Sequence, residues 1–239
     1  MIKTILFDLD GTLLPMDQTI FVNDYCSRIT KHIVPFGYDT NLVMKAFWLG
    51  VKAMSENDGS CTNQERFWQV FRSILGDSIL SHEADLEEFY RTEFNEVAKV
   101  CGFTENARKL IDLLKQRKYR IVLATNPFFP SIATENRIRW AGLTPDDFEY
   151  YTTYEYCTYC KPNPKYYEEL LSKINCKPDE CLMIGNDTGD DMIAGALGIK
   201  VFLLTDCLIN TNNDDICNYP HGGFDELFDY LDAIYEETV

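Results

Sequence analysis

Residues 2–12, Ile-Lys-Thr-Ile-Leu-Phe-Asp-Leu-Asp-Gly-Thr, join a short apolar run to two aspartates. The run at 2–7 is typical of a buried strand, and the Asp-x-Asp-Gly that follows it predicts a sharp turn. Asp8 and Asp10 therefore lie at the end of the first predicted strand. One carboxylate could attack phosphorus and the other could protonate the leaving oxygen. Turn formation or helix capping is the alternative role for both.

The chain from about residue 104 onward alternates between predicted helices and strands. This alternation is typical of a parallel sheet covered by helices on both faces. We therefore expect an α/β fold with a Rossmann-like parallel-sheet core, in which ligands bind beyond the carboxyl ends of the strands. Helices are expected at 106–118, 130–140, 164–174, 190–197 and 224–235, and strands at 121–124, 150–154, 181–184 and 201–204.

The segment before this alternation has a different pattern. Between residues 16 and 98, apolar residues such as Val43, Phe47, Val51 and Met54 recur every three or four positions, with no convincing strand. Such spacing indicates a run of amphipathic helices. The expected organisation is a core domain at 1–15 and 99–239, with a helical domain inserted at 16–98.

Three further polar segments follow predicted strands. Thr125 and Asn126 offer a hydroxyl and nearby backbone N–H groups that could donate to phosphate oxygens. Lys161, before a helix opened by proline, could supply a fixed positive charge. The segment 185–191 crowds Asp187, Asp190 and Asp191 after a predicted strand and could hold a hard cation such as Mg²⁺. Taken singly, each segment could also be a turn, a surface lysine or a helix N-terminus.

The order of these four segments resembles the haloacid dehalogenase-like superfamily, over roughly residues 1–15 and 100–239. The family's motifs are D-x-D-G-[TS], a Thr or Ser after a strand, a Lys often followed by Pro, and an acidic pair shaped like G-D-x-x-x-D. The stretch from Asp8 to Thr12 matches the first motif, Thr125 the second and Lys161 the third. Asp187 and Asp191 match the acidic pair of the fourth motif.

The fourth motif departs from the family pattern. The family's motif begins Gly-Asp, whereas Asn186 stands between Gly185 and Asp187 here. Asp187 and Asp191 have the matching spacing of four, but Asp190 could replace Asp191. The second acidic residue of the metal site therefore stays open at this point.

The resemblance implies a Mg²⁺-dependent phosphatase with a type 1 helical cap. Asp8 would form an aspartyl-phosphate, and Asp10 would protonate the leaving alcohol and then activate water. A phosphomutase, a metal-independent dehalogenase and a non-catalytic phosphate-binding protein are the alternatives, although Asp10 and the acidic fourth motif argue against a dehalogenase. The implied metal ligands are Asp8, Asp10 (through its carbonyl), Asp187 and Asp191, and the implied phosphate-binding residues are Thr125, Asn126 and Lys161.

Composition narrows the class of partner. The 239 residues carry a net charge of −16, which disfavours nucleic acid and anionic membranes. No apolar stretch has the length of a signal peptide core or a membrane span. We therefore expect a cytoplasmic protein, monomeric or a small homo-oligomer, that acts on a small phosphorylated substrate.

Overall fold

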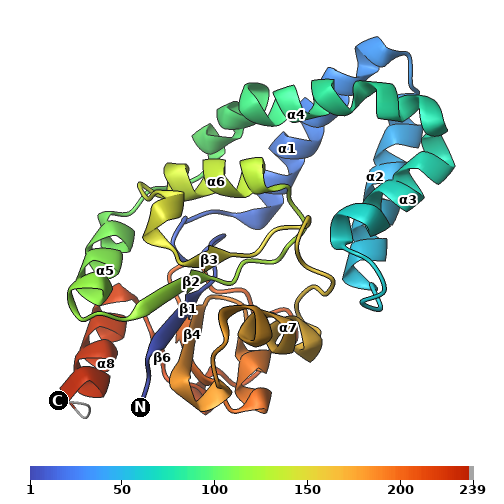
Figure 1. The fold of residues 1–239 in the computed structure, drawn as a ribbon. Coiled ribbons are helices and arrows are strands. Elements are labelled where there is room, and N and C mark those ends of the chain that lie inside the picture. Colours follow the sequence, from blue (N-terminus) through green and yellow to red (C-terminus); the bar gives the residue numbers. More distant parts are fainter. Residues whose placement is uncertain (237–239) are drawn as a thin grey trace.

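A computed structural model describes residues 1–236, and within this range it contains a six-stranded sheet of order β3-β2-β1-β4-β5-β6 (Figure 1). Every neighbouring pair of strands is parallel. The predicted α/β class is confirmed, whereas β6 is absent from the prediction. The strands are β1 (Thr4–Phe7), β2 (Arg120–Leu123), β3 (Tyr150–Tyr151), β4 (Cys181–Gly185), β5 (Lys200–Leu204) and β6 (His221–Gly222).

Alternate side chains of the central strands pack on opposite faces of the sheet, as the period of two in a strand requires. Ile5 and Phe7 of β1 join the cluster that includes α5, α6 and α8, whereas Leu6 joins the cluster built on α7. Both faces are therefore buried under helices. The core helices are α5 (Glu105–Gln116), α6 (Ser131–Trp140), α7 (Pro164–Ile174) and α8 (Phe224–Glu236).

The segment after β4 differs from the predicted helix at 190–197. The chain there forms a 3-10 helix at Met192–Leu197. The Asp187 carboxylate accepts the backbone N–H groups of Gly189 and Asp190, which folds this stretch into a turn instead of a first helical turn. Asp190 and Asp191 consequently lie in a loop beyond the carboxyl end of β4.

The predicted insertion contains α-helices and 3-10 helices joined by loops between Gln18 and Val100, and no strand lies in this stretch. We call α1 to α4 the cap helices; Figure 1 shows them projecting from the sheet, with α2 and α3 side by side. The chain leaves and re-enters the core through adjacent segments, because the Gly102 N–H donates to the Pro15 carbonyl at 2.7 Å. The division at 15/16 and 98/99 stays a prediction. The cap helices are α1 (Gln18–Ile33), α2 (Thr40–Ser55), α3 (Asn63–Leu75) and α4 (Glu83–Arg91).

Over residues 1–236, no helix combines the length and the apolar character needed to cross a membrane.

Candidate active site

The polar segments meet where the strand order reverses. From β1, the sheet continues to β2 and β3 on one side and to β4, β5 and β6 on the other. A crevice suited to ligands lies at such a switch point, beyond the carboxyl ends of the strands. Asp8 directly follows β1, Thr125 follows β2 and Asp187 follows β4. The Asp8 N–H donates to the Ile184 carbonyl at 2.9 Å, which fixes its backbone against β4.

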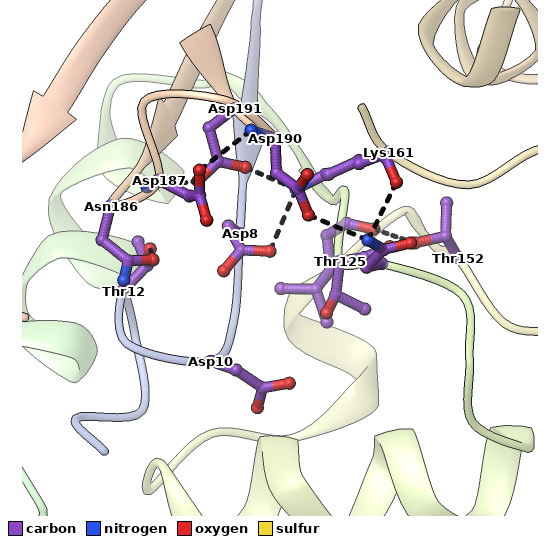
Figure 2. A network of polar contacts seen from close by, with 12 residues as sticks. Asp8, Asp10, Thr12, Thr125, Thr152, Lys161, Asn186, Asp187, Asp190 and Asp191 are labelled. Atoms are coloured by element: carbon purple, nitrogen blue, oxygen red, sulfur yellow. Dashed lines mark hydrogen bonds and ion pairs between the residues drawn. The ribbon is translucent and has the colours of Figure 1, made fainter. Parts of the chain in front are cut away.

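Lys161 connects two of these segments through its ammonium group. Its Nζ donates to Asp8 Oδ1 at 3.0 Å and to Asp191 Oδ1 at 2.6 Å (Figure 2). Burial disfavours the charged ammonium, but the Asp191 and Asp8 carboxylates outweigh it and raise the pKa of Lys161 well above its ordinary value. A buried cation is therefore held beside Asp8.

Asp8 lies in an environment with excess negative charge. Burial raises its pKa to about 8; Lys161 opposes this rise, whereas Asp191 and Asp10 add to it. One ammonium faces two buried carboxylates here. An additional cation would lower the pKa of Asp8 and keep the carboxylate ionised.

Asp10 pairs with a residue that the sequence analysis missed. Arg137 of α6 is fully buried, and its Nη1 forms an ion pair with Asp10 Oδ2. The guanidinium also stacks on the Phe129 ring, with 4.4 Å between Cζ and the ring centroid. Burial raises the pKa of Asp10, and Arg137 and Lys161 oppose that rise. The other oxygen, Asp10 Oδ1, is buried without a hydrogen-bond partner within the described range.

The sequence contains a pattern that places Arg137 on the buried side of its helix. Ala133, Arg137 and Ala141 recur every four residues on the buried side of α6 and its end. A basic residue in such a buried stripe needs a carboxylate partner. Its partner could not be identified without knowing which strand end faces α6.

The fourth segment divides its carboxylates among different partners. Asp191 is buried against Lys161, and its Oδ2 accepts the Asp187 N–H at 3.0 Å. Asp190 Oδ2 instead accepts Asn126 Nδ2 at 2.9 Å. Burial raises the pKa of Asp190 to about 6, an effect that Lys161 opposes. The geometry thus directs Asp191 towards Lys161 and Asp190 towards Asn126.

The two predicted phosphate-binding residues after β2 are tied to the surrounding loops. The Thr125 carbonyl accepts hydroxyl groups from Thr152 and Tyr166 at 2.5 and 2.9 Å. The Asn126 amide donates to the Lys161 carbonyl at 3.3 Å as well as to Asp190. The side-chain donors of Asn126 are therefore engaged within the protein.

Asn186, the departure from the family pattern, joins the first and fourth segments. Its Oδ1 accepts the Thr12 hydroxyl at 2.9 Å, and its Nδ2 donates to the Cys207 carbonyl at 2.7 Å. Gly11, at φ +88°, allows this approach, because a Cβ there would lie 2.3 Å from Asn186 Nδ2. Gly185 similarly leaves room for the Asp191 carboxyl group, which a Cβ would meet at 2.2 Å.

The donor chemistry of the crevice fits a hard divalent cation. Asp8, Asp187 and Asp191 supply carboxylate oxygens, and Asp10 Oδ1 and Asn126 Oδ1 are buried acceptors without partners in the described part of the chain. Within residues 1–236, however, no three such side chains converge into a formed metal cluster. Asp191 and Asp187 are instead engaged by Lys161 and by backbone N–H groups.

Comparison with known proteins identifies the family. A sequence model of the haloacid dehalogenase-like hydrolases matches residues 2–198. The chain belongs to this family. The resemblance read from the motifs is thereby confirmed, and the protein is a hydrolase of a family that generally uses a divalent metal.

Individual relatives cover most of the chain at low identity. Glyceraldehyde 3-phosphate phosphatase of Methanothermobacter thermautotrophicus is 21% identical over 90% of this chain and 91% of its own. The pyrophosphatase PpaX of Bacillus pumilus is 24% identical over 83% and 81%. The crystal structure of a phosphatase of the family from Thermococcus onnurineus superposes with a TM-score of 0.59 at 19% identity, over 96% and 98% of the two chains. This last similarity supports the shared fold.

Proposed function

We propose that this hydrolase is a Mg²⁺-dependent phosphatase of small phosphorylated metabolites that forms an aspartyl-phosphate on Asp8. The observation that carries the proposal is the position of Asp8, which lies at the topological switch point with Lys161 Nζ 3.0 Å away. A nucleophile for phosphoryl transfer needs adjacent positive charge, because both it and its target are anionic. The family match and the two phosphatase relatives support the reaction class.

The proposed mechanism assigns a step to each aspartate of the first motif. An Asp8 oxygen attacks phosphorus, and the bond to the leaving oxygen breaks as Asp10 gives that oxygen a proton. Asp10 then takes a proton from the water that attacks the aspartyl-phosphate, which releases phosphate and free Asp8. Arg137 holds the Asp10 carboxyl group throughout.

The remaining residues bind and position. Lys161, Thr125 and the backbone at Asn126 would hold the phosphoryl oxygens, and Asp191 keeps Lys161 in place. Bound Mg²⁺ would neutralise phosphoryl charge in the transition state. Its proposed ligands are Asp8, the Asp10 carbonyl, Asp187 and Asp191, the last of which reaches the ion only if it gives up part of its contact with Lys161.

Hydrolysis of p-nitrophenyl phosphate tests the proposal. The purified protein should release nitrophenol with MgCl₂ and not with EDTA, and Asp8→Asn should abolish release. Asp17→Asn removes the exposed carboxylate at the N-cap of α1, and it is the matched control for the loss of one negative charge. The phosphatase proposal would be contradicted if the protein hydrolysed neither this substrate nor any member of a panel of phosphorylated metabolites. A product that retains the phosphoryl group would instead identify a mutase.

A further inference from the structure

A cavity of about 200 Å³ lies between the cap helices and the core, beside the proposed phosphatase site. Cap residues on its wall include Tyr25, Phe67, Trp68 and Tyr90, and the core contributes residues 128 and 130–132 and residues 154–155. The first of these core residues, Phe128, lies three residues after Thr125. The core wall of the cavity therefore begins on the segment that follows Thr125 and Asn126, although neither of these two residues lines it.

The connection to Asp10 runs through two neighbouring aromatic rings. The Tyr25 ring on the cavity wall lies 5.3 Å from the Phe129 ring, which carries the Arg137 guanidinium on its face. Arg137 in turn binds Asp10. The organic part of a substrate whose phosphate lies at Asp8 thus has an adjacent compartment.

The wall of this cavity has the electrostatic character of a cation site. Aromatic faces present negative potential to a ligand. Glu83, Glu87 and Glu155 also line the cavity, and no Lys, Arg or His belongs to its lining among residues 1–236. Arg91 forms an ion pair with Glu87 from outside the lining. A second phosphate or carboxylate on the substrate would be repelled here.

Glu155 supplies an unsatisfied acceptor. Its Oε1 accepts the N–H and the hydroxyl of Ser131 at 2.8 and 3.0 Å. Its Oε2 is buried and has no hydrogen-bond partner within the described chain. A buried carboxylate oxygen left without a partner costs free energy, which a ligand with a cationic N–H donor would recover.

We propose that this cavity binds an ammonium group on the organic part of the substrate, so that the enzyme prefers phosphate esters of amino alcohols. This inference rests on the proposed phosphatase function. The aromatic rings would surround the cation, and Glu155 Oε2 would accept a hydrogen bond from an N–H group of the ammonium.

Paired substrates of equal length test the proposal, because they differ mainly in charge. We would compare 2-aminoethyl, 3-aminopropyl and 5-aminopentyl phosphate with propyl, butyl and hexyl phosphate. At the length that fits, kcat/KM should favour the ammonium member by at least about tenfold. Equal values at every length would overturn the proposal while leaving the phosphatase function intact.

Glu155→Gln is the diagnostic variant, because its amide oxygen can still accept from Ser131 while the charge is lost. The ammonium preference should fall by about tenfold, chiefly through KM. Glu168→Gln, at an exposed position of α7 outside the cavity lining, should keep the preference. A preference that survives Glu155→Gln unchanged would contradict the site.

A binding measurement separates this proposal from the phosphatase activity. Calorimetry with Asp8→Asn protein should show tighter binding of 5-aminopentyl phosphate than of hexyl phosphate if that length fits, and the same comparison applies to the shorter pairs. If neither p-nitrophenyl phosphate nor the panel of phosphorylated metabolites is hydrolysed, the proposed function fails, but this titration still decides whether the cavity selects a cation. Equal affinity within all three pairs would refute the cation site.

Discussion

Arg137 Nη1 and Asp10 Oδ2 form an ion pair that joins α6 to the turn after β1, with the arginine fully buried. This pair gives the proposed acid and base a fixed position. It also supplies the positive charge that opposes the effect of burial on the pKa of Asp10.

Replacing Arg137 with Met should lower kcat by about 10²-fold, because Asp10 would lose its orientation and counter-charge. The pKa of Asp10 would rise further, so Asp10 would keep its proton to higher pH. The step in which Asp10 activates water would then fail over a wider acidic range. The acidic limb of the kcat–pH profile should move to higher pH.

Two variants control for the loss of an arginine. Arg139→Met removes an arginine of the same helix that pairs with Glu135, and should leave the profile unchanged. Arg137→Lys should restore part of kcat. Superimposable pH profiles for Arg137→Met and wild type would argue against the positioning role.

Removal of the metal should make stability depend on pH through Asp8. Without a cation, burial holds the folded pKa of Asp8 at about 8, against an ordinary value of 3.8 for an aspartate. The folded state therefore holds a proton that the unfolded chain releases, and this contribution to stability is lost as pH rises from about 4 towards 8. Mg²⁺ competes with that proton, so MgCl₂ should raise Tm more at pH 8.5 than at pH 5.5.

Thermal scans with EDTA and with MgCl₂ at both pH values measure this effect. Asp8→Asn has no carboxyl group to titrate and should show a smaller difference between the two values of pH. An equal effect of MgCl₂ at both pH values in the wild type would count against cation binding at Asp8.

Asp147 should contribute to stability away from the site. Burial opposes its ionisation, but hydrogen bonds from Arg108 and Lys115, at 2.7 and 2.5 Å, lower its pKa to about 2. The folded pKa lies below the unfolded value, so this stability is present above pH 4 and is lost as pH falls towards 2. Asp147→Asn should lower the free energy of unfolding by about 1–2 kcal/mol at pH 7.

Urea unfolding at pH 7 and at pH 3 measures this contribution, and the cost of Asp147→Asn should shrink at pH 3. Asp146→Asn, at the exposed neighbouring position, should be neutral at both. A cost for Asp147→Asn that does not depend on pH would contradict the ion-pair explanation.

Alanine substitutions at Gly11 and Gly37 distinguish the cost of backbone strain from the cost of a clash with Asn186. Both have positive φ, of +88° and +85°, but a Cβ on Gly37 would meet nothing within 4 Å. Gly37→Ala should therefore cost about 1 kcal/mol, from strain alone. Gly11→Ala should cost more in unfolding experiments and should also reduce turnover, since it displaces Asn186. Equal losses for the two variants would show that the contact with Asn186 is unimportant.

The sequence predicted the parts of the fold that local pattern determines. The apolar runs at β1, β2, β4 and β5 and their alternation with helices specify a parallel sheet, and the carboxyl ends of its strands must meet at one edge. Lys161 beside Asp8 follows from that arrangement. Strand β6, only His221 and Gly222, has too few residues to show a period.

The features that the sequence did not reveal depend on contacts between distant segments. Arg137 is a surface-type residue in isolation, and its role appears only when α6 packs over the turn at Asp10. The turn at Asp187 depends on a side chain accepting backbone N–H groups, which shifts the expected helix to Met192. Glu155 gains significance from the cap helices opposite it.

Covalent labelling of Asp8 is the decisive test of the aspartyl-phosphate mechanism. The enzyme would be mixed with p-nitrophenyl phosphate and MgCl₂, quenched in acid within milliseconds, and digested for mass spectrometry. We predict a phosphoryl group on the peptide that contains Asp8, absent in Asp8→Asn and after longer incubation once substrate is exhausted. Turnover of substrate with no phosphoryl group on Asp8 at any quench time, or with the group on another residue, would contradict a covalent intermediate on Asp8.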